Sequence, residues 1–139
     1  MPESPCVTHH LHIHGYTTTA KEDTEKEFGA LDVYGSDARE IRQLIKDDST
    51  LGQPLNSALP YVKAEVVWAV RHEMARTIED ILARRTRALF LNARAAIAMA
   101  PTVADLMASE LAWDDLTRTK QISAFGEVAS NYILHPMNQ

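Results

Sequence analysis

Residues 77–92 read TIEDILARRTRALFLN. The apolar residues of this stretch recur every three or four positions, which is the spacing of an amphipathic α-helix. Three arginines, Arg84, Arg85 and Arg87, interrupt the pattern, and Arg85 falls on the apolar face itself. Guanidinium groups are costly to bury unless carboxylates meet them. The cluster therefore predicts either ion pairing within the fold or recognition of an anion on a ligand or partner.

Carboxylates at suitable spacings are candidate partners for these arginines. Asp80 lies four residues before Arg84, so the two side chains can pair on one face of a helix. Arg85 is expected to pair with Glu65 or Glu73 of the preceding helix. The anion-binding alternative stays open, because residues 61–100 carry seven basic and four acidic side chains. The candidates for structural ion pairs or a domain interface are Glu65, Glu73, Asp80, Arg84, Arg85 and Arg87.

Similar periodicity along the chain predicts an all-α domain of about five helices, in an orthogonal or bundle-like arrangement. Thr77 and Asp80 form a variant capping box that begins one helix, and Asp114 is placed to cap the last. Trp68, Trp113 and Phe125 are expected in the core, and Met74 and Phe90 on apolar helix faces. Helices are expected at 37–48, at 61–74, from Thr77, through 92–111 with a kink or restart at Pro101, and from Asp114 to near Pro136.

An extended arm is expected before the helices. Val7, Leu11 and Ile13 alternate with polar residues, which predicts a short strand or an extended arm over residues 7–16, followed by a polar linker. Three histidines would share one face of such a strand, and three imidazoles can bind zinc. Their outer members would start ~13 Å apart, and no carboxylate or cysteine completes a site, so polar surface or a domain contact is favoured. These histidines are His10, His12 and His14.

Composition narrows the functional classes. The net charge of −5 argues against a nucleic-acid platform, and the single cysteine, Cys6, fits a reducing compartment. The chain has no apolar run of the ~18 residues that span a membrane. It also has no glycine-rich phosphate loop, no G-x-S-x-G and no CxxC. His72 is better interpreted as structural than as a general base. We therefore assign no catalytic, cofactor-binding or metal-ligating residue.

One longer pattern resembles a known family. It runs E-V-x-x-A-x-x-x-E-x-A-x-T-x-x-D-x-L-x-R-R-T-R from Glu65 to Arg87, followed by F-L-N at 90–92 and L-x-W-D at 111–114. It is similar to the C-terminal domain of FAD-dependent glycerol-3-phosphate dehydrogenases and of the related α-glycerophosphate oxidases. Two upstream segments, L-x-I-H-G at 11–15 and Y-G-S at 34–36, resemble the junction into that domain.

The resemblance implies a part of an enzyme. In that family an N-terminal domain carries FAD, oxidises glycerol 3-phosphate to dihydroxyacetone phosphate and passes electrons to a quinone. Residues 1–35 would then be the arm and linker that join a missing FAD domain, and residues 36–139 a helical accessory domain. The fragment would bind no cofactor, perform no catalysis and contact the FAD domain of its own polypeptide. Met1 would be an introduced start.

Several wider expectations follow from the same resemblance. The parent enzyme would be cytoplasmic and peripherally membrane-associated, with a possible homo-oligomer and no nucleic-acid partner. One alternative is a free-standing helical interaction module that binds a partner protein through a basic patch of Arg84, Arg85 and Arg87. Another is a small regulatory protein with a histidine metal site.

Overall fold

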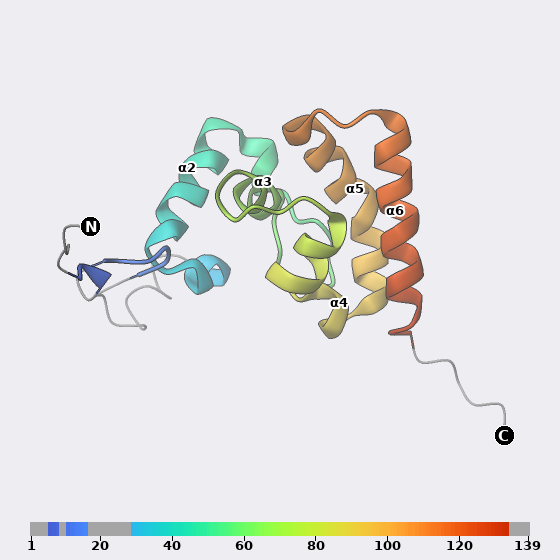
Figure 1. Cartoon of the computed structure of the whole chain (residues 1–139), viewed down its shortest axis with the longest axis horizontal. Coiled ribbons are helices and arrows are strands. Elements are labelled where there is room, and N and C mark those ends of the chain that lie inside the picture. The colour runs from blue at the N-terminus through green and yellow to red at the C-terminus, as the bar shows by residue number, and fades with distance from the viewer. Residues whose placement is uncertain (1–5, 9–10, 17–28, 134–139) are drawn as a thin grey trace, which may run out of the picture. The chain divides into compact units, whose positions relative to one another are not determined.

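The protein is built from helices, as the sequence predicts. The computed structural model describes residues 6–8, 11–16 and 29–133 (Figure 1). Within these ranges there is no strand, and the only extended pairing is an isolated antiparallel bridge between Pro54 and Val62. The all-α fold class is therefore confirmed. Contacts divide the chain into a unit of residues 1–43 and a unit of residues 44–139, and each is described by itself.

The first unit contains the arm and a series of 3-10 turns. η2 (Gly29–Asp37) is interrupted at Gly35, whose φ is 55°, and α2 (Ala38–Asp47) begins directly after it and continues into the second unit. Of the short strand or extended arm expected over residues 7–16, no strand forms in the residues described there, which are coil and turns. Alternating polarity alone cannot hold a strand, because its backbone groups need a pairing partner.

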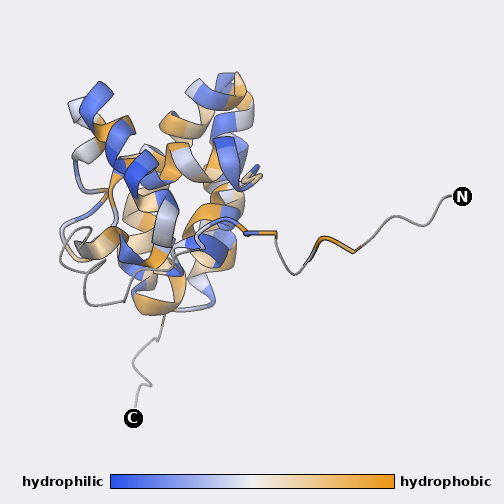
Figure 2. Cartoon of the chain, turned by 90° about the vertical axis from the view of Figure 1, so that its left-hand side faces the viewer, coloured by the Kyte–Doolittle hydropathy of each residue, from blue (hydrophilic) through white to orange (hydrophobic). Residues whose placement is uncertain are grey.

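The second unit is a bundle of helices and short helical turns. α5 and α6 lie side by side along their lengths, and α4 packs at the N-terminal end of α5 (Figure 1). Hydrophobic and hydrophilic residues alternate along the ribbons, as expected of helices with one buried face (Figure 2). The elements are η3 (Ser49–Gly52), α3 (Lys63–His72), η4 (Asp80–Arg85), α4 (Ala88–Leu91), α5 (Ala93–Leu111) and α6 (Asp115–Ser130). None of the helices in the described ranges combines the length and apolar character needed to cross a membrane.

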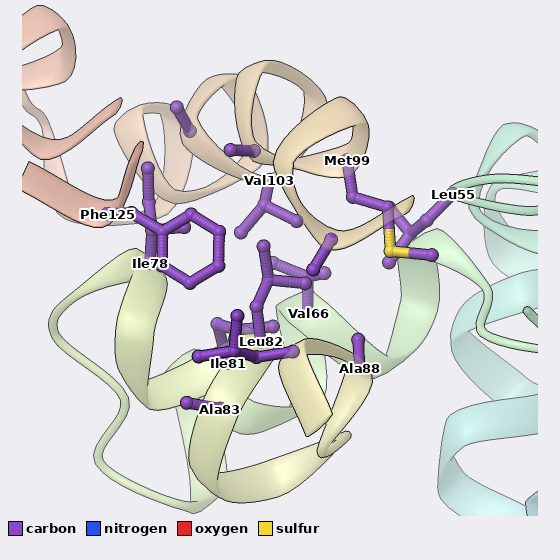
Figure 3. Close-up of a cluster of buried hydrophobic side chains, with 14 of the residues drawn as sticks. Leu55, Val66, Ile78, Ile81, Leu82, Ala83, Ala88, Met99, Val103 and Phe125 are labelled. Atoms are coloured by element: carbon purple, nitrogen blue, oxygen red, sulfur yellow. The ribbon is translucent and has the colours of Figure 1, made fainter. Parts of the chain in front are cut away.

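The core of the second unit forms where α3, η4, α5 and α6 meet (Figure 3). Trp68 and Phe125 are each 2% exposed, as expected, while Trp113 is only partly buried against the same cluster. Ala96 and Ala104 on α5 are fully buried. Their small side chains allow the neighbouring helices to approach closely. Other members of the core are Leu55, Val66, Ile78, Ile81, Leu82, Ala83, Ala88, Met99 and Val103.

Of the kink or restart expected at Pro101, the restart is wrong, because α5 runs through this residue from Ala93 to Leu111. Two expected side-chain positions are also wrong. Met74 lies beyond α3 in a left-handed conformation and is 78% exposed. Phe90 is 57% exposed, because Arg87 adopts a positive φ of 59° and turns the chain before α4 begins. A helix that breaks at one residue changes which side chains face the core after the break.

Both predicted helix caps are present. The Thr77 hydroxyl accepts from the Asp80 N–H at 3.1 Å, and the Asp80 carboxylate accepts from the Thr77 N–H at 3.0 Å. Asp114 accepts from the Thr117 N–H at 2.7 Å at the start of α6. Each cap satisfies a donor that would otherwise lack a partner at a helix N-terminus.

Candidate functional site

The arginine-rich stretch forms a compact ionic cluster on η4, centred on Asp80. One carboxylate oxygen of Asp80 accepts from the backbone N–H groups of Arg76 and Thr77, both at 3.0 Å. The other accepts from Arg84 at 2.6 Å and lies 3.9 Å from Arg85. Asp80 therefore serves as a helix cap and as the shared partner of two arginines.

The pKa of Asp80 reflects this crowding. Burial alone would raise it, but the hydrogen bonds from Arg76, Thr77 and Arg84 outweigh burial and lower the pKa to about 2. Hydrogen bonds to the ionised form of a carboxyl group favour that form. Asp80 is therefore a charged structural anchor at neutral pH and cannot act as a proton donor there.

Arg85 joins η4 to the C-terminal end of α3. Its Nε lies 3.3 Å from the Glu73 carboxylate, and its Nη2 donates to the Glu73 carbonyl. Its Nη1 donates to the Asp80 carbonyl at 3.1 Å, and its side chain is 22% exposed. A cation at this position also interacts favourably with the dipole at the C-terminus of α3. Of the two partners considered for Arg85, the structure places Glu73 beside it.

Glu65 lies at the opposite end of α3 from this cluster. It is 4% exposed, and its carboxylate accepts from the Val62 N–H at 2.6 Å. Glu65 therefore caps the N-terminus of its own helix. The structure brings together Glu73, Asp80, Arg84 and Arg85, and places Glu65 elsewhere.

η4 has the wider winding of a π-helix, and this explains how two adjacent arginines both reach carboxylates. The Thr86 N–H and the Thr86 hydroxyl both donate to the carbonyl of Ile81, five residues earlier, at 3.0 and 2.9 Å. The Tyr61 hydroxyl donates to the Thr86 carbonyl and fixes the end of the turn. Single π-helical turns are uncommon and are often found at functional sites.

Arg87 differs from its two neighbours. Arg84 pairs with Glu79 at 2.7 Å and Asp80 at 2.6 Å, and Arg85 is paired as described. Arg87 is exposed and has no ion pair with any residue in the described ranges. The three arginines therefore do not form one basic patch, because two of them are neutralised within the fold.

Sequence reasoning missed three participants in this cluster. Arg76 donates from its side chain to the carbonyls of Val70 and Ala75 at 3.2 and 2.8 Å, at the end of α3. The sequence pattern likewise predicts no contact for Tyr61 or Thr86. The threonine lies inside the Arg-Arg-Thr-Arg motif, so its position was a usable signal. Nothing in the sequence around Arg76 or Tyr61 indicates the hydrogen bonds that these residues make to backbone carbonyls.

Two histidines of the arm take part in separate contacts. The His14 Nδ1 lies 3.1 Å from the Asp37 carboxylate, and His12 stacks on Tyr16 with ring centroids 4.0 Å apart. His10 lies outside the described residues. In the ranges that the structure describes, no three residues among His, Cys, Asp and Glu gather as metal ligands would.

His72 lies on α3, away from the arm, and stacks on Trp68 with ring centroids 4.0 Å apart. This contact gives it a packing role, as expected of a structural histidine.

The two segments that resemble a family junction lie against each other. Gly15 and Gly35 have positive φ values of 76° and 55°, which residues with a side chain rarely adopt. A Cβ on Gly35 would lie 2.0 Å from the Gly15 carbonyl oxygen. Both glycines are therefore required for this close backbone approach. The neighbouring residues His14 and Asp37 are also in contact through their side chains.

A cleft of about 330 Å³ lies elsewhere on the second unit. Arg71 donates two hydrogen bonds to Glu110 in its wall, at 2.7 and 2.8 Å. The hydrogen bond to Glu110 raises the pKa of Arg71. Asp47 and Asp48 also line the cleft. None of the six candidate residues lies in its lining, so the cleft and the ionic cluster are separate features.

Comparison with known proteins identifies the family. A model described as the C-terminal domain of alpha-glycerophosphate oxidase matches residues 6–118. A mitochondrial glycerol-3-phosphate dehydrogenase of Homo sapiens is 35% identical over 108 residues, which cover 75% of this chain and 14% of the human protein. A mitochondrial glycerol-3-phosphate dehydrogenase of Arabidopsis thaliana is 31% identical over 145 residues, covering 86% of this chain and 23% of that relative.

The chain thus spans about a seventh of the human relative and less than a quarter of the plant relative. No solved structure matches the chain. The matched residues include the whole ionic cluster and the described glycine junction. The chain belongs to the family of C-terminal domains of alpha-glycerophosphate oxidase.

Proposed function

We propose that this chain is the C-terminal accessory domain of a membrane-associated, FAD-dependent glycerol-3-phosphate dehydrogenase. The parent enzyme would oxidise glycerol 3-phosphate to dihydroxyacetone phosphate and pass the electrons to a quinone. The domain itself would support structure and docking without catalysis. The observation that carries the proposal is a family match over most of this chain, together with relatives several times its length that bear the dehydrogenase name.

The residues present do not fit FAD. A dinucleotide is held at the N-terminus of a helix, where free backbone N–H groups and a glycine-rich loop meet the pyrophosphate. Among the described helices, the starts of α3, α5 and α6 are each met by a carboxylate or amide oxygen of the protein, from Glu65, Asn92 and Asp114. FAD would therefore be held by another part of the enzyme, and no step of the oxidation is assigned to this domain.

The ionic cluster supports a structural role. Arg85 and Arg76 satisfy carbonyls at the end of α3, while Asp80 satisfies N–H groups at the start of the next turn. Together they fix the connection between α3 and η4. Breaking one partner of a half-buried pair leaves the other charge without compensation. The cluster would therefore hold the helical domain in shape for docking.

The arm supports a junction with a preceding domain. Val7, Leu11 and Ile13 are 63%, 65% and 75% exposed, so the apolar side chains of the arm are not buried in this chain. The close approach of Gly15 to Gly35 gives the arm a defined turn before the helices begin. An exposed apolar segment of this kind is suited to packing against another domain.

Two assays test this proposal. The purified 139-residue chain, mixed with FAD and glycerol 3-phosphate, should reduce neither a quinone analogue nor oxygen. Turnover by this chain alone would contradict the accessory role. In the complete enzyme, Arg85→Leu should lower thermal stability but leave the rate of flavin reduction per folded molecule unchanged. Arg118→Leu is the control, because its partner Asp105 is 59% exposed. Equal stability of the Arg85 and Arg118 variants would refute the structural role of Arg85.

A free-standing interaction module remains the second candidate. The observation that favours it is an exposed surface around α4, which includes the unpaired Arg87. The coding sequence upstream of residue 1 separates the two candidates, since only the first requires a flavin domain in the same reading frame.

A further inference from the structure

Five exposed side chains gather around α4, and we call them the α4 patch: Arg87, Phe90, Leu91, Arg94 and Tyr132. Phe90 is 57% exposed, Leu91 64% and Tyr132 48%. The Phe90 and Tyr132 rings meet edge to face, with centroids 5.5 Å apart and planes at 83°. Arg94 and Tyr132 also line a shallow hollow of about 190 Å³. The patch therefore combines residues of α4 and the start of α5 with Tyr132, which lies just after α6.

The patch is both apolar and positively charged. Arg87 and Arg94 are exposed, and neither forms an ion pair within the ranges that the structure describes. Arg84, three positions before the first residue of the patch, already pairs with two carboxylates. Arg87 also holds a left-handed conformation with a φ of 59°, which is unfavourable for a residue with a side chain. Local strain of this kind is concentrated at binding sites and switch regions.

We propose that the α4 patch is the surface through which this domain docks onto the flavin and substrate domain of its own polypeptide. This inference rests on the proposed function and names the docking face. The partner surface would be apolar at its centre and carry carboxylates opposite Arg87 and Arg94. Aromatic residues and arginine are the types that dominate binding energy at protein interfaces.

Three arguments favour this occupant over others. A symmetric contact between two copies would join two patches that each carry Arg87 and Arg94 and no carboxylate, so that like charges would oppose the contact. A membrane-surface anchor usually needs a longer amphipathic helix, whereas α4 has only four residues. Most of the length of the relatives lies outside the matched region. A further domain of the same polypeptide would therefore be available as a covalently attached partner.

A cysteine-accessibility experiment tests the inference. Leu91→Cys is introduced into a Cys6→Ser background, because Cys6 is exposed and would also react. The matched control is Leu116→Cys on α6, since Leu116 is 61% exposed and lies outside the patch. Maleimide labelling of each position is followed by peptide mass spectrometry in the 139-residue chain and in the complete enzyme. Leu91→Cys should label about tenfold more slowly, or slower still, in the complete enzyme, while Leu116→Cys should label equally in both.

Each other outcome overturns a defined claim. Equal labelling of Leu91→Cys in both proteins, with an intact flavin domain present, overturns the docking face alone. A reading frame without a flavin domain overturns the proposed function and the docking partner together. Protection of Leu91→Cys in the 139-residue chain by vesicles of phosphatidylcholine and phosphatidylserine would assign the patch to lipid. Protection in that chain that disappears on dilution would assign it to self-association. Either of these last two results overturns domain docking.

Discussion

Replacing Asp80 with asparagine should destabilise the domain through the loss of one charge. Asp80→Asn keeps an oxygen that can accept from the N–H groups of Arg76 and Thr77, which Asp80 now caps at 3.0 Å. It removes the negative charge that faces Arg84 at 2.6 Å and Arg85 at 3.9 Å. The substitution therefore measures how much the Asp80 charge contributes to stability, while the helix cap and the size of the side chain stay nearly the same.

The lowered pKa of Asp80 gives the expected size of the loss in stability. Its pKa falls from an ordinary value of 3.8 to about 2 in the folded protein, a difference of roughly 1.8 units. At 1.36 kcal/mol per unit, this corresponds to about 2 kcal/mol of stability at neutral pH, as an upper value because the side chain remains 20% exposed. Because the folded-state pKa is lowered, the contribution is fully present above about pH 4. It is lost as the pH falls from about 4 to about 2.

Urea unfolding, followed by circular dichroism at pH 7, 5, 4 and 3, measures this effect. Asp80→Asn should unfold with a free energy about 2 kcal/mol lower than the wild type at pH 7, and the difference should shrink at pH 3. Asp105→Asn is the control, because Asp105 is 59% exposed and should cost under about 0.5 kcal/mol. A cost for Asp80→Asn as small as that of Asp105→Asn, or one that does not change with pH, would show that the Asp80 charge does not stabilise the domain.

Three further substitutions probe the same region. Tyr61→Phe removes the hydroxyl that donates to the Thr86 carbonyl, and should lower the unfolding free energy by about 1 kcal/mol in urea titrations. Met74→Gly relieves a φ of 56°, and calorimetry should show a gain of about 0.5–1 kcal/mol after the entropy cost of glycine. Ile81→Ala leaves a cavity at a fully buried position and should cost about 2–5 kcal/mol, whereas a cost below 1 would contradict the packing in Figure 3.

Local signals in the sequence were sufficient to place most of the helices. The capping box of Thr77 and Asp80 and the cap at Asp114 involve residues three positions apart, so short-range chemistry determines them. The buried positions Trp68 and Phe125 follow from helical spacing alone. These features depend on neighbours in the sequence, and pattern reasoning applies directly to such neighbours.

Features set by tertiary contacts were harder to predict. The hydrogen bonds of the π-helical turn at η4 span five residues instead of the four of an α-helix, and a short apolar pattern cannot resolve this difference. The left-handed Arg87 then exposes Phe90, which the helical pattern places on an apolar helix face. Pro101 is accommodated inside α5, although proline usually disrupts a helix interior.

The candidate site was predictable in its composition and less so in its pairing. Asp80 with Arg84, four residues apart, could be expected from helix geometry. The choice between Glu65 and Glu73 as the partner of Arg85 depends on which end of α3 meets η4, and no local pattern determines that. The exposed, unpaired state of Arg87 likewise depends on the turn that precedes α4.

The most direct test of the central claim is to read the coding sequence immediately upstream of residue 1. If the chain is the C-terminal domain of a flavoenzyme, an uninterrupted frame should encode a strand, a G-x-G-x-x-G loop and a helix, followed by the rest of a flavin domain. An in-frame stop codon followed by a genuine start at Met1 would contradict it, and the chain would then act as a free-standing helical module.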